Sequence, residues 1–297
     1  MQPDDMLRPF GETGLIVSAL GLGAGQIGSP DQDDAEVERL LNTVVDSGVT
    51  LIDTARGYGL SEERIGRHLS HRREEIVIST KVGYSIPGYE DWTGPIITAG
   101  VDAALERLQT DYLDIVHLHS CPVEVLARGE VVEALQRTVE AGKVRVAAYS
   151  GDNEPLRHAI ESGRFRGVET SINVADQRVI DEGLAMARER GLGVIAKRPL
   201  ANAPWRFPSR PVGHYSEVYW ERLEEMQLDP GGLSWDELAL RFAAYLPGVS
   251  SCIVGTSSLD HLRRNLAIVE QGPLPEEVVR SICEAFKAHD EGWVGQV

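Results

Sequence analysis

Four side chains of the kinds that transfer protons lie at or just beyond the ends of apolar segments. Asp53, Lys81 and His119 each end a run rich in Ile, Leu and Val, and Tyr58 follows Asp53 by five residues. A carboxylate beside an ammonium keeps the ammonium charged, and the ammonium favours the ionised form of a nearby phenol. If the four side chains meet, the tyrosine can give a proton to a carbonyl group and take one back from an alcohol.

The segments that carry these residues alternate between two patterns. Short runs of β-branched and other apolar residues predict strands, and the stretches between them have the spacing of helices with one buried side. The predicted strands cover residues 18–24, 50–54, 76–82, 113–119, 144–150, 167–173, 192–197 and 251–255. Eight strands, each followed by a helix, favour a (β/α)8 TIM barrel, whose downstream strand ends carry chemistry. A doubly wound sheet would produce similar local patterns.

Three segments add to this plan. Residues 8–17 precede the first strand, and their Gly-Glu-Thr-Gly sequence predicts a hairpin turn that could plug the bottom of the barrel. The loops after strands 3 and 7, residues 83–95 and 201–233, are long and rich in aromatic residues. Both follow strands, where long ordered loops usually form lids or substrate walls. No linker or repeat divides the chain, so we expect residues 1–297 to form one domain.

Composition limits the partners and the compartment. The chain has 29 basic and 46 acidic residues, a net charge of −17, which disfavours nucleic acid and anionic membranes as partners. No apolar run has the length of a membrane span. Residues 1–5 lack the basic and apolar parts of a signal peptide. The three cysteines, an odd number without a CxxC pair, favour reduced thiols and a cytoplasmic location.

The motifs around the four residues occur in a characteristic order and spacing. They are Gly21-Leu22-Gly23, Asp53-Thr54-Ala55-Arg56-Gly57-Tyr58-Gly59-Leu60-Ser61-Glu62, Ser79-Thr80-Lys81 and Asp111-Tyr112-Leu113-Asp114-Ile115-Val116-His117-Leu118-His119. Over nearly its whole length the chain resembles the aldo-keto reductase family. The resemblance implies a (β/α)8 barrel that binds NAD(P)H and passes a hydride between the nicotinamide and a carbonyl carbon, or in reverse oxidises an alcohol or sugar. It makes Tyr58 the general acid/base, Asp53 and Lys81 the groups that tune it, and His119 the residue that orients the carbonyl.

The resemblance also implies a cofactor site, with departures from the usual pattern. Ser150 would face the carboxamide of the nicotinamide, but Gly151 stands where asparagine is usual and Glu169 where glutamine is usual. Arg198 replaces a stacking aromatic residue, and a guanidinium plane can also stack on a ring. The implied cofactor-binding residues are Gly23, Ser150, Glu169, Arg198, Pro199, Leu200, Gly255, Thr256, Ser257, Arg264 and Asn265.

The eighth unit, residues 255–265, resembles the segment that holds the adenine end of the cofactor. Amides and hydroxyls at a helix N-terminus suit phosphate, and Asn265 would contact the adenine. NADPH-preferring members carry a lysine and an arginine where this chain has Gly255 and His261. Arg263 or Arg264 could take their part, so we expect NADP, with NAD as the alternative.

Two other functions stay open at this stage. A lysine at a strand end, Lys81 or Lys197, suits a Schiff-base aldolase on the same barrel. A non-catalytic regulatory subunit that binds cofactor is the second alternative, because the carboxamide site is altered. We assign no role to His117 or Cys121 and expect no metal site. The physiological substrate, the direction of the reaction and the oligomeric state are not indicated.

Overall fold

The computed structural model describes residues 6–296, so the expectation about residues 1–5 lies outside its described part. Eight parallel strands close into a barrel in the order β10-β3-β4-β5-β6-β7-β8-β9. The TIM barrel is therefore confirmed, and a doubly wound sheet is excluded by the pairing of β9 with β10. The strands are β3 (Leu20–Gly23), β4 (Leu51–Asp53), β5 (Val77–Val82), β6 (Leu113–His119), β7 (Val144–Ser150), β8 (Gly167–Ser171), β9 (Gly193–Lys197) and β10 (Ser251–Gly255).

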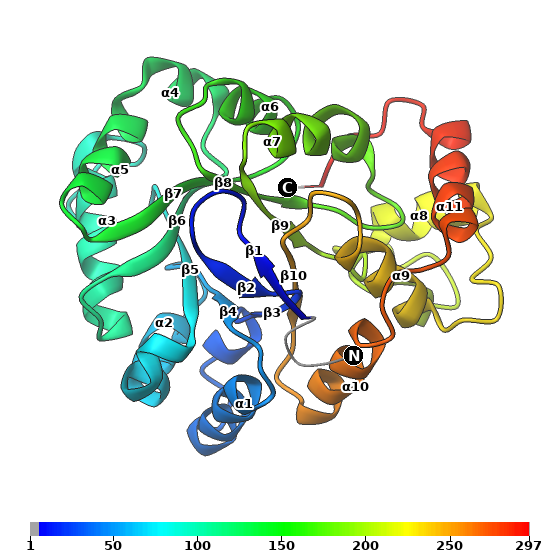
Figure 1. Ribbon diagram of the computed structural model, residues 1–297, viewed down its shortest axis with the longest axis horizontal. Helices are drawn as coiled ribbons and strands as arrows, with labels where there is room; N and C mark the ends of the chain where they lie inside the picture. The colour runs from blue at the N-terminus through cyan, green and yellow to red at the C-terminus, as the bar shows by residue number, and fades with distance from the viewer. Residues whose placement is uncertain (1–5, 297) are drawn as a thin grey trace.

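A ring of helices surrounds the barrel (Figure 1). The helices are α1 (Asp34–Asp46), α2 (Ser61–Leu69), α3 (Gly94–Leu108), α4 (Val123–Arg128), α5 (Glu130–Glu140), α6 (Asn153–Glu161), α7 (Ala185–Glu189), α8 (Glu217–Met226), α9 (Trp235–Ala244), α10 (Leu259–Val269) and α11 (Glu276–His289). Gly129, with φ of 82°, separates α4 from α5. A π-helical turn over Ile180–Leu184 precedes α7.

The lower end of the barrel is closed by the N-terminal hairpin, as the sequence predicts. Strands β1 (Leu7–Pro9) and β2 (Ile16–Ser18) pair antiparallel and lie across the end of the barrel that faces the viewer in Figure 1. Phe10 is fully buried there. A Cβ atom on Gly193 would lie 2.4 Å from the Phe10 ring, so the barrel wall needs glycine at this position to admit the phenyl group.

Both long connections are present at the opposite end of the barrel. Residues 83–93 link β5 to α3, and residues 198–234 link β9 to α9. The second is not a plain loop, because it contains a short 3-10 helix, Pro204–Arg206, and the whole of α8. Tyr219 of α8 is buried and donates a hydrogen bond to Asp176, so part of this aromatic content packs the connection itself.

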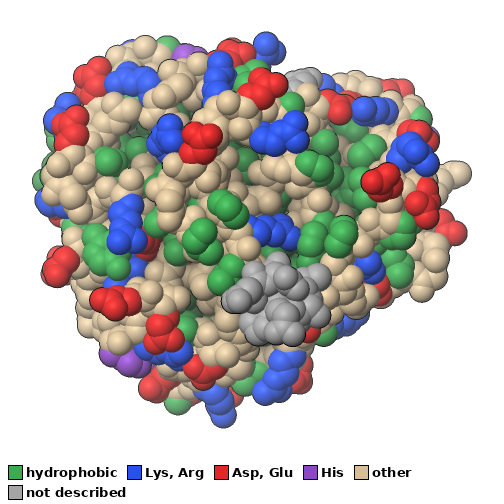
Figure 2. Space-filling model, in the orientation of Figure 1, with side chains coloured by type: hydrophobic (Ala, Val, Ile, Leu, Met, Phe, Trp, Pro, Cys, Tyr) green, Lys and Arg blue, Asp and Glu red, His purple; other side chains and the backbone are tan. Residues whose placement is uncertain are grey.

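The three cysteines form no disulfide bonds, and charged side chains cover much of the visible surface. Acidic and basic side chains are interspersed over the face shown in Figure 2. Cys121 and Cys252 are buried, Cys283 is half-buried, and all three are free. Between residues 6 and 296, no helix combines the length and the apolar character needed to cross a membrane.

We expect Phe10→Ala to lower the free energy of unfolding by about 3–5 kcal/mol, because it removes the phenyl group and leaves a cavity between the hairpin and the barrel. Urea denaturation followed by circular dichroism measures this change. Ile16→Ala, on the exposed side of the same hairpin, is the control and should change stability by no more than about 0.5 kcal/mol. Equal stability of the Phe10 variant and the wild type would contradict the plug.

Candidate active site

The ends of β4, β5 and β6 bring Asp53, Lys81 and His119 to the same face of the barrel. Register places Asp53 beside Ser79 and Lys81 beside His117 on neighbouring strands. The Lys81 ammonium donates to Asp53 Oδ2 at 2.5 Å and to the Thr54 carbonyl at 3.0 Å. Burial disfavours the ammonium, but the charges of Asp53 and Glu169 outweigh burial and raise the pKa of Lys81. Lys81 is therefore a buried, fixed cation.

A charged Lys81 opposes the aldolase alternative. Schiff-base formation needs a neutral amine, which a lysine gains when its pKa falls. The pKa of Lys81 moves in the opposite direction. Lys197, the other candidate, forms an ion pair with Asp152 at 2.8 Å.

The Tyr58 loop is held tightly against the turn that follows β3. Leu60 N donates to the Gly28 carbonyl at 2.9 Å, and a Cβ atom on Gly28 would overlap the Tyr58 carbonyl oxygen. The side chain of Ser61 is buried, accepts a hydrogen bond from Thr54 and donates to the Ala24 carbonyl. These contacts orient Tyr58 toward the strand ends.

Tyr58 lies between the lysine and the histidine. The Lys81 nitrogen is 5.3 Å from the centroid of the phenol ring, and the His119 ring meets the phenol edge-on at 6.3 Å between centroids. Lys81 acts to lower the pKa of Tyr58, but burial and the charges of Asp53 and Glu169 raise it to about 12. The expectation that the ammonium favours the ionised phenol holds for the contribution of Lys81, but the net shift in the pKa of Tyr58 has the opposite sign.

Tyr84 is a member of the site that the sequence did not single out. Its hydroxyl lies 2.7 Å from His119 Nδ1, and the two rings stack at 5.4 Å between centroids. Burial and Lys81 lower the pKa of His119 to about 3, so its imidazole is neutral. The signal available in the sequence was the aromatic loop after β5, in which Tyr84 also contacts Trp92.

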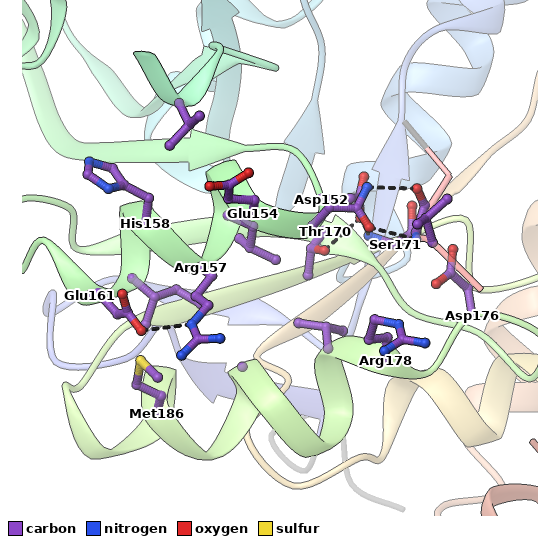
Figure 3. Close-up of a pocket in the computed structure, with 18 of the residues that line it drawn as sticks. Asp152, Glu154, Arg157, His158, Glu161, Thr170, Ser171, Asp176, Arg178 and Met186 are labelled. Atoms are coloured by element: carbon purple, nitrogen blue, oxygen red, sulfur yellow. Dashed lines mark hydrogen bonds and ion pairs between the residues drawn. The ribbon is translucent and has the colours of Figure 1, made fainter. Parts of the chain in front are cut away.

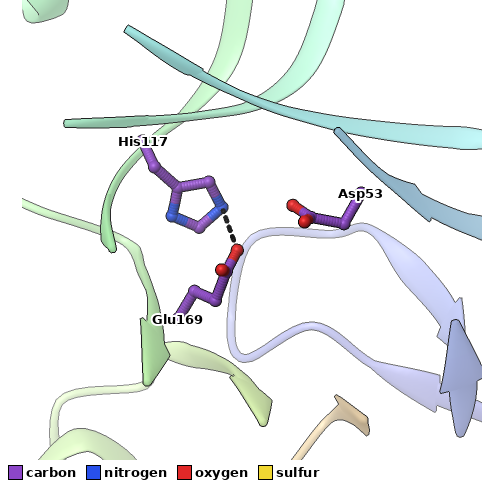
Figure 4. Close-up of side chains that lie close together, drawn as sticks. All are labelled: Asp53, His117 and Glu169. Atoms are coloured by element: carbon purple, nitrogen blue, oxygen red, sulfur yellow. Dashed lines mark ion pairs between the residues drawn. The ribbon is translucent and has the colours of Figure 1, made fainter. Parts of the chain in front are cut away.

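Further buried polar groups surround the Asp53–Lys81 pair. The Ser79 hydroxyl donates to Asp53 Oδ1 at 2.8 Å and lies 3.0 Å from His117 Nε2, which in turn is 3.8 Å from Glu169 Oε2 (Figure 4). Asp53, His117 and Glu169 have ligand atoms within 4.8 Å of one another. The Lys81 ammonium already supplies a positive charge to both carboxylates of this group, at 2.5 and 3.3 Å.

The residues expected at the nicotinamide lie beside this group. Ser150 donates to Glu169 Oε1 at 3.2 Å across the register of β7 and β8. A Cβ atom on Gly151 would lie 2.4 Å from the Tyr149 hydroxyl, so the usual asparagine does not fit here. Glu169 Oε2 is buried and has no hydrogen-bond donor among the described residues, although Lys81 lies within ion-pair distance. A carboxylate oxygen in this state suits an amide NH2 group.

Arg198 is held by the C-terminal segment. It has φ of 55° and donates to Ser171 Oγ at 3.1 Å and to the carbonyl oxygen of Gln296. Pro199 is buried and Leu200 half-buried in the turn that follows. The guanidinium therefore lies over the end of β8 and has two partners before any ligand is considered.

The residues expected at the adenine end gather around the start of α10. Gly23 and Gly255 are register partners on β3 and β10, Gly255 and Ser257 are exposed, and Thr256 and Asn265 are buried. Ser258 caps α10 by accepting from the His261 amide at 3.4 Å. Arg264 forms an ion pair with Asp236 at 2.8 Å. The implied cofactor residues thus form a band that follows the adjacent strands β7, β8, β9, β10 and β3 and reaches α10.

A large cavity opens next to this band and not over Tyr58. It has a volume of about 680 Å³ and lies between α6 and the π-helical turn before α7 (Figure 3). Its inner end reaches Asp152 and Ser171, which contact Lys197 and Arg198. Its outer lining includes Arg157, His158, Glu161, Arg178 and Met186.

Comparison with known proteins agrees with the barrel fold. Residues 19–287 match the profile of the Aldo/keto reductase family. An L-galactose dehydrogenase of Arabidopsis thaliana is 29% identical over 89% of this chain and 88% of its own length. An NADH-specific methylglyoxal reductase of Escherichia coli (strain K12) is 26% identical over 94% of this chain and 98% of its own. The holo form of an aldo-keto reductase from Bacillus halodurans superposes with a TM-score of 0.81 at 28% identity, covering 94% of this chain and 95% of that one.

The fold and these likenesses define an NAD(P)H-dependent oxidoreductase that acts on carbonyl groups. The chain belongs to the aldo/keto reductase family. The aldolase and regulatory-subunit alternatives are not favoured.

We expect His119 to carry its hydrogen on Nε2, because Tyr84 can donate its own hydroxyl hydrogen to Nδ1 of the neutral ring. Tyr84→Phe removes this donor, so we expect the variant to lose the single tautomer. Nitrogen-15 NMR of labelled histidine measures the tautomer in both proteins. Tyr89→Phe, an exposed change in the same loop, is the control. An identical His119 spectrum in the wild type and in Tyr84→Phe would contradict this positioning.

Proposed function

We propose that Tyr58 transfers the proton of the reaction, that Lys81 and Asp53 set its acidity, and that His119 orients the substrate carbonyl. The observation that carries this proposal is the 2.5 Å contact between Lys81 and Asp53 directly beneath the phenol. A neutral imidazole can donate one hydrogen bond to a carbonyl oxygen. The neutrality of His119 and its fixed Nδ1 contact support that role.

The band of residues from Ser150 to Asn265 supports a site for the nicotinamide dinucleotide. When bound, the dinucleotide supplies or accepts the hydride. Ser150 and Glu169 would hold the carboxamide, and Arg198, Pro199 and Leu200 would lie along the middle of the cofactor. Gly23, Gly255, Thr256, Ser257, Arg264 and Asn265 would surround its adenine end.

NADP(H) is the cofactor we propose, with NAD(H) as the alternative. Backbone amides at a helix start such as that of α10 suit phosphate, and Arg263 and Arg264 lie on the exposed side of this helix. Arg264 forms an ion pair with Asp236, so part of its charge is already neutralised. NAD(H), which has no 2′-phosphate, is therefore the alternative. One relative is described as NADH-specific.

The substrate we propose is a small aldehyde or ketone, or the corresponding alcohol or sugar in the reverse direction. The relatives named a methylglyoxal reductase and an L-galactose dehydrogenase represent both directions. We also propose that residues 1–297 form a single domain, that the protein is cytoplasmic, and that neither nucleic acid nor a membrane is a partner. The net charge of −17 supports the last point.

We expect Tyr58→Phe to bind cofactor as the wild type does but to lose most of its turnover, because only the transferable proton is removed. Quenching of intrinsic fluorescence by NADPH and by NADH, titrated separately, measures affinity and shows which is preferred. Initial rates with a panel of carbonyl compounds and alcohols then measure turnover. Near-normal turnover of the variant would reject the assignment of Tyr58.

The kcat values of the two directions should depend differently on pH. Carbonyl reduction needs protonated Tyr58, and the raised pKa of about 12 keeps the phenol protonated at neutral pH. We therefore expect the kcat of reduction to stay nearly constant between about pH 7 and pH 9. Alcohol oxidation needs the phenolate, so its kcat should rise with pH over the same range. A reduction rate that falls through this range would indicate a lower pKa in the cofactor complex.

A further inference from the structure

Glu169 lies in contact with the proton-transfer group and not only beside the expected nicotinamide. It is 2% exposed, and its Oε2 atom is 3.3 Å from the Lys81 nitrogen. Its Oε1 atom accepts the Ser150 hydrogen bond. The Asp53 carboxylate, at 2.5 Å, already carries the one negative charge needed to neutralise the Lys81 ammonium. Glu169 is therefore an additional negative group that the Asp53–Lys81 pair does not require.

The charges around Lys81 do not balance if both carboxylates are ionised. One ammonium then faces two carboxylates, and His117 adds no positive charge because burial lowers its pKa to about 4. Burial and the charge of Glu169 raise the pKa of Asp53, although Lys81 opposes this shift. The two carboxyl groups share one ammonium, so they titrate together as a coupled pair. The last proton that this pair holds is released at a pH above the usual range of a carboxyl group. The titratable and charged groups that face the pair are Tyr58, Lys81, His117, His119 and Lys197.

This excess charge acts over short distances in a dry region. The side chains of Lys81, Asp53 and Glu169 are at most 3% exposed. A charge pair that is excluded from solvent is screened far less than one at the surface. A charge of this kind changes a neighbouring ionisation or binding equilibrium by about tenfold or more.

We propose that Glu169 is a positioning residue that acts through Lys81: its carboxylate strengthens the hold of Tyr58 on its proton and favours the oxidised, positively charged nicotinamide over the reduced ring. The part that concerns the nicotinamide rests on the proposed function. The part that concerns Tyr58 rests on the contacts of Glu169 with Lys81 and does not need a cofactor.

The consequence for the reaction has a definite sign. A negative charge beside the nicotinamide stabilises the ring once it has given up its hydride, so the bound cofactor becomes a stronger reductant. The same charge offsets that of Lys81 and keeps Tyr58 protonated. The effect on the nicotinamide favours carbonyl reduction over alcohol oxidation on the enzyme. The effect on Tyr58 maintains the protonated form that reduction uses and makes that form a weaker acid.

Glu169→Gln tests the proposal, because it removes the charge and keeps the size and shape of the side chain. At pH 9 both carboxyl groups of the wild type are ionised, so the difference in charge is largest. We expect the ratio of the Kd of NADP⁺ to the Kd of NADPH to rise about tenfold in the variant. Contacts with the adenosine and phosphate groups contribute equally to the two dissociation constants, so they do not change the ratio. NAD⁺ and NADH replace this pair if the protein binds them better.

A titration of the phenols tests the other part without cofactor. Tyrosinate absorbance is followed to pH 11 in the wild type, in Tyr58→Phe, in Glu169→Gln and in the double variant, with circular dichroism to verify the fold. Subtracting the titration curve of the corresponding variant that carries Tyr58→Phe leaves the absorbance change that is due to Tyr58. We expect the Tyr58 signal to be weak in the wild type and to appear at least about one pH unit lower in Glu169→Gln.

Glu140→Gln, on the exposed end of α5, is the matched control and should leave both readouts unchanged. The proposal is overturned if Glu169→Gln leaves either the ratio of dissociation constants or the Tyr58 titration as in the wild type. If the wild type binds neither nucleotide, the cofactor part of the proposed function fails. The phenol titration then still decides whether Glu169 acts on Tyr58.

Discussion

The structure is organised around a lysine ammonium that is buried at the centre of a barrel. Taking an ion out of water costs several kcal/mol, so Lys81 is tolerated only where carboxylates meet it in good geometry. Asp53 meets this need from the neighbouring strand, and the Thr54 carbonyl adds a second acceptor. Parallel register is what makes the contact available, because it aligns the ends of β4 and β5. The acidity of Tyr58 and the neutrality of His119 both depend on this fixed cation.

The two ends of the barrel differ: apolar residues that stabilise the fold lie at one end, and the polar residues of the candidate active site lie at the other. At the lower end, Phe10 fills the space between glycines of the barrel wall, and apolar side chains from several strands pack around it. At the upper end, the inward positions of the same strands carry polar groups. Tyr58 and Tyr84 enter the site from loops, and both loops are held by close backbone or ring contacts. A rigid base of this kind lets loops supply reactive groups without losing their geometry.

Departures from the usual family pattern have physical explanations inside this barrel. Gly151 leaves room for the Tyr149 hydroxyl, and the space that an asparagine would need is filled. Glu169 brings a second carboxylate to Lys81 in place of a neutral amide. Of these two departures, Glu169 changes the balance of charge around Tyr58, whereas Gly151 changes only the packing.

The sequence by itself determined the alternation of eight apolar strands with helices and favoured a closed barrel, and the pairing of β9 with β10 then excluded a doubly wound sheet. It also located Asp53, Lys81 and His119 at strand ends, since strand periodicity and motif order are local properties. Only the tertiary structure decided that Glu169 contacts Lys81, because register and barrel closure set distances between residues 88 positions apart. The net pKa of Tyr58 was likewise decided by tertiary contacts, since burial and the charges of three strands act on it together.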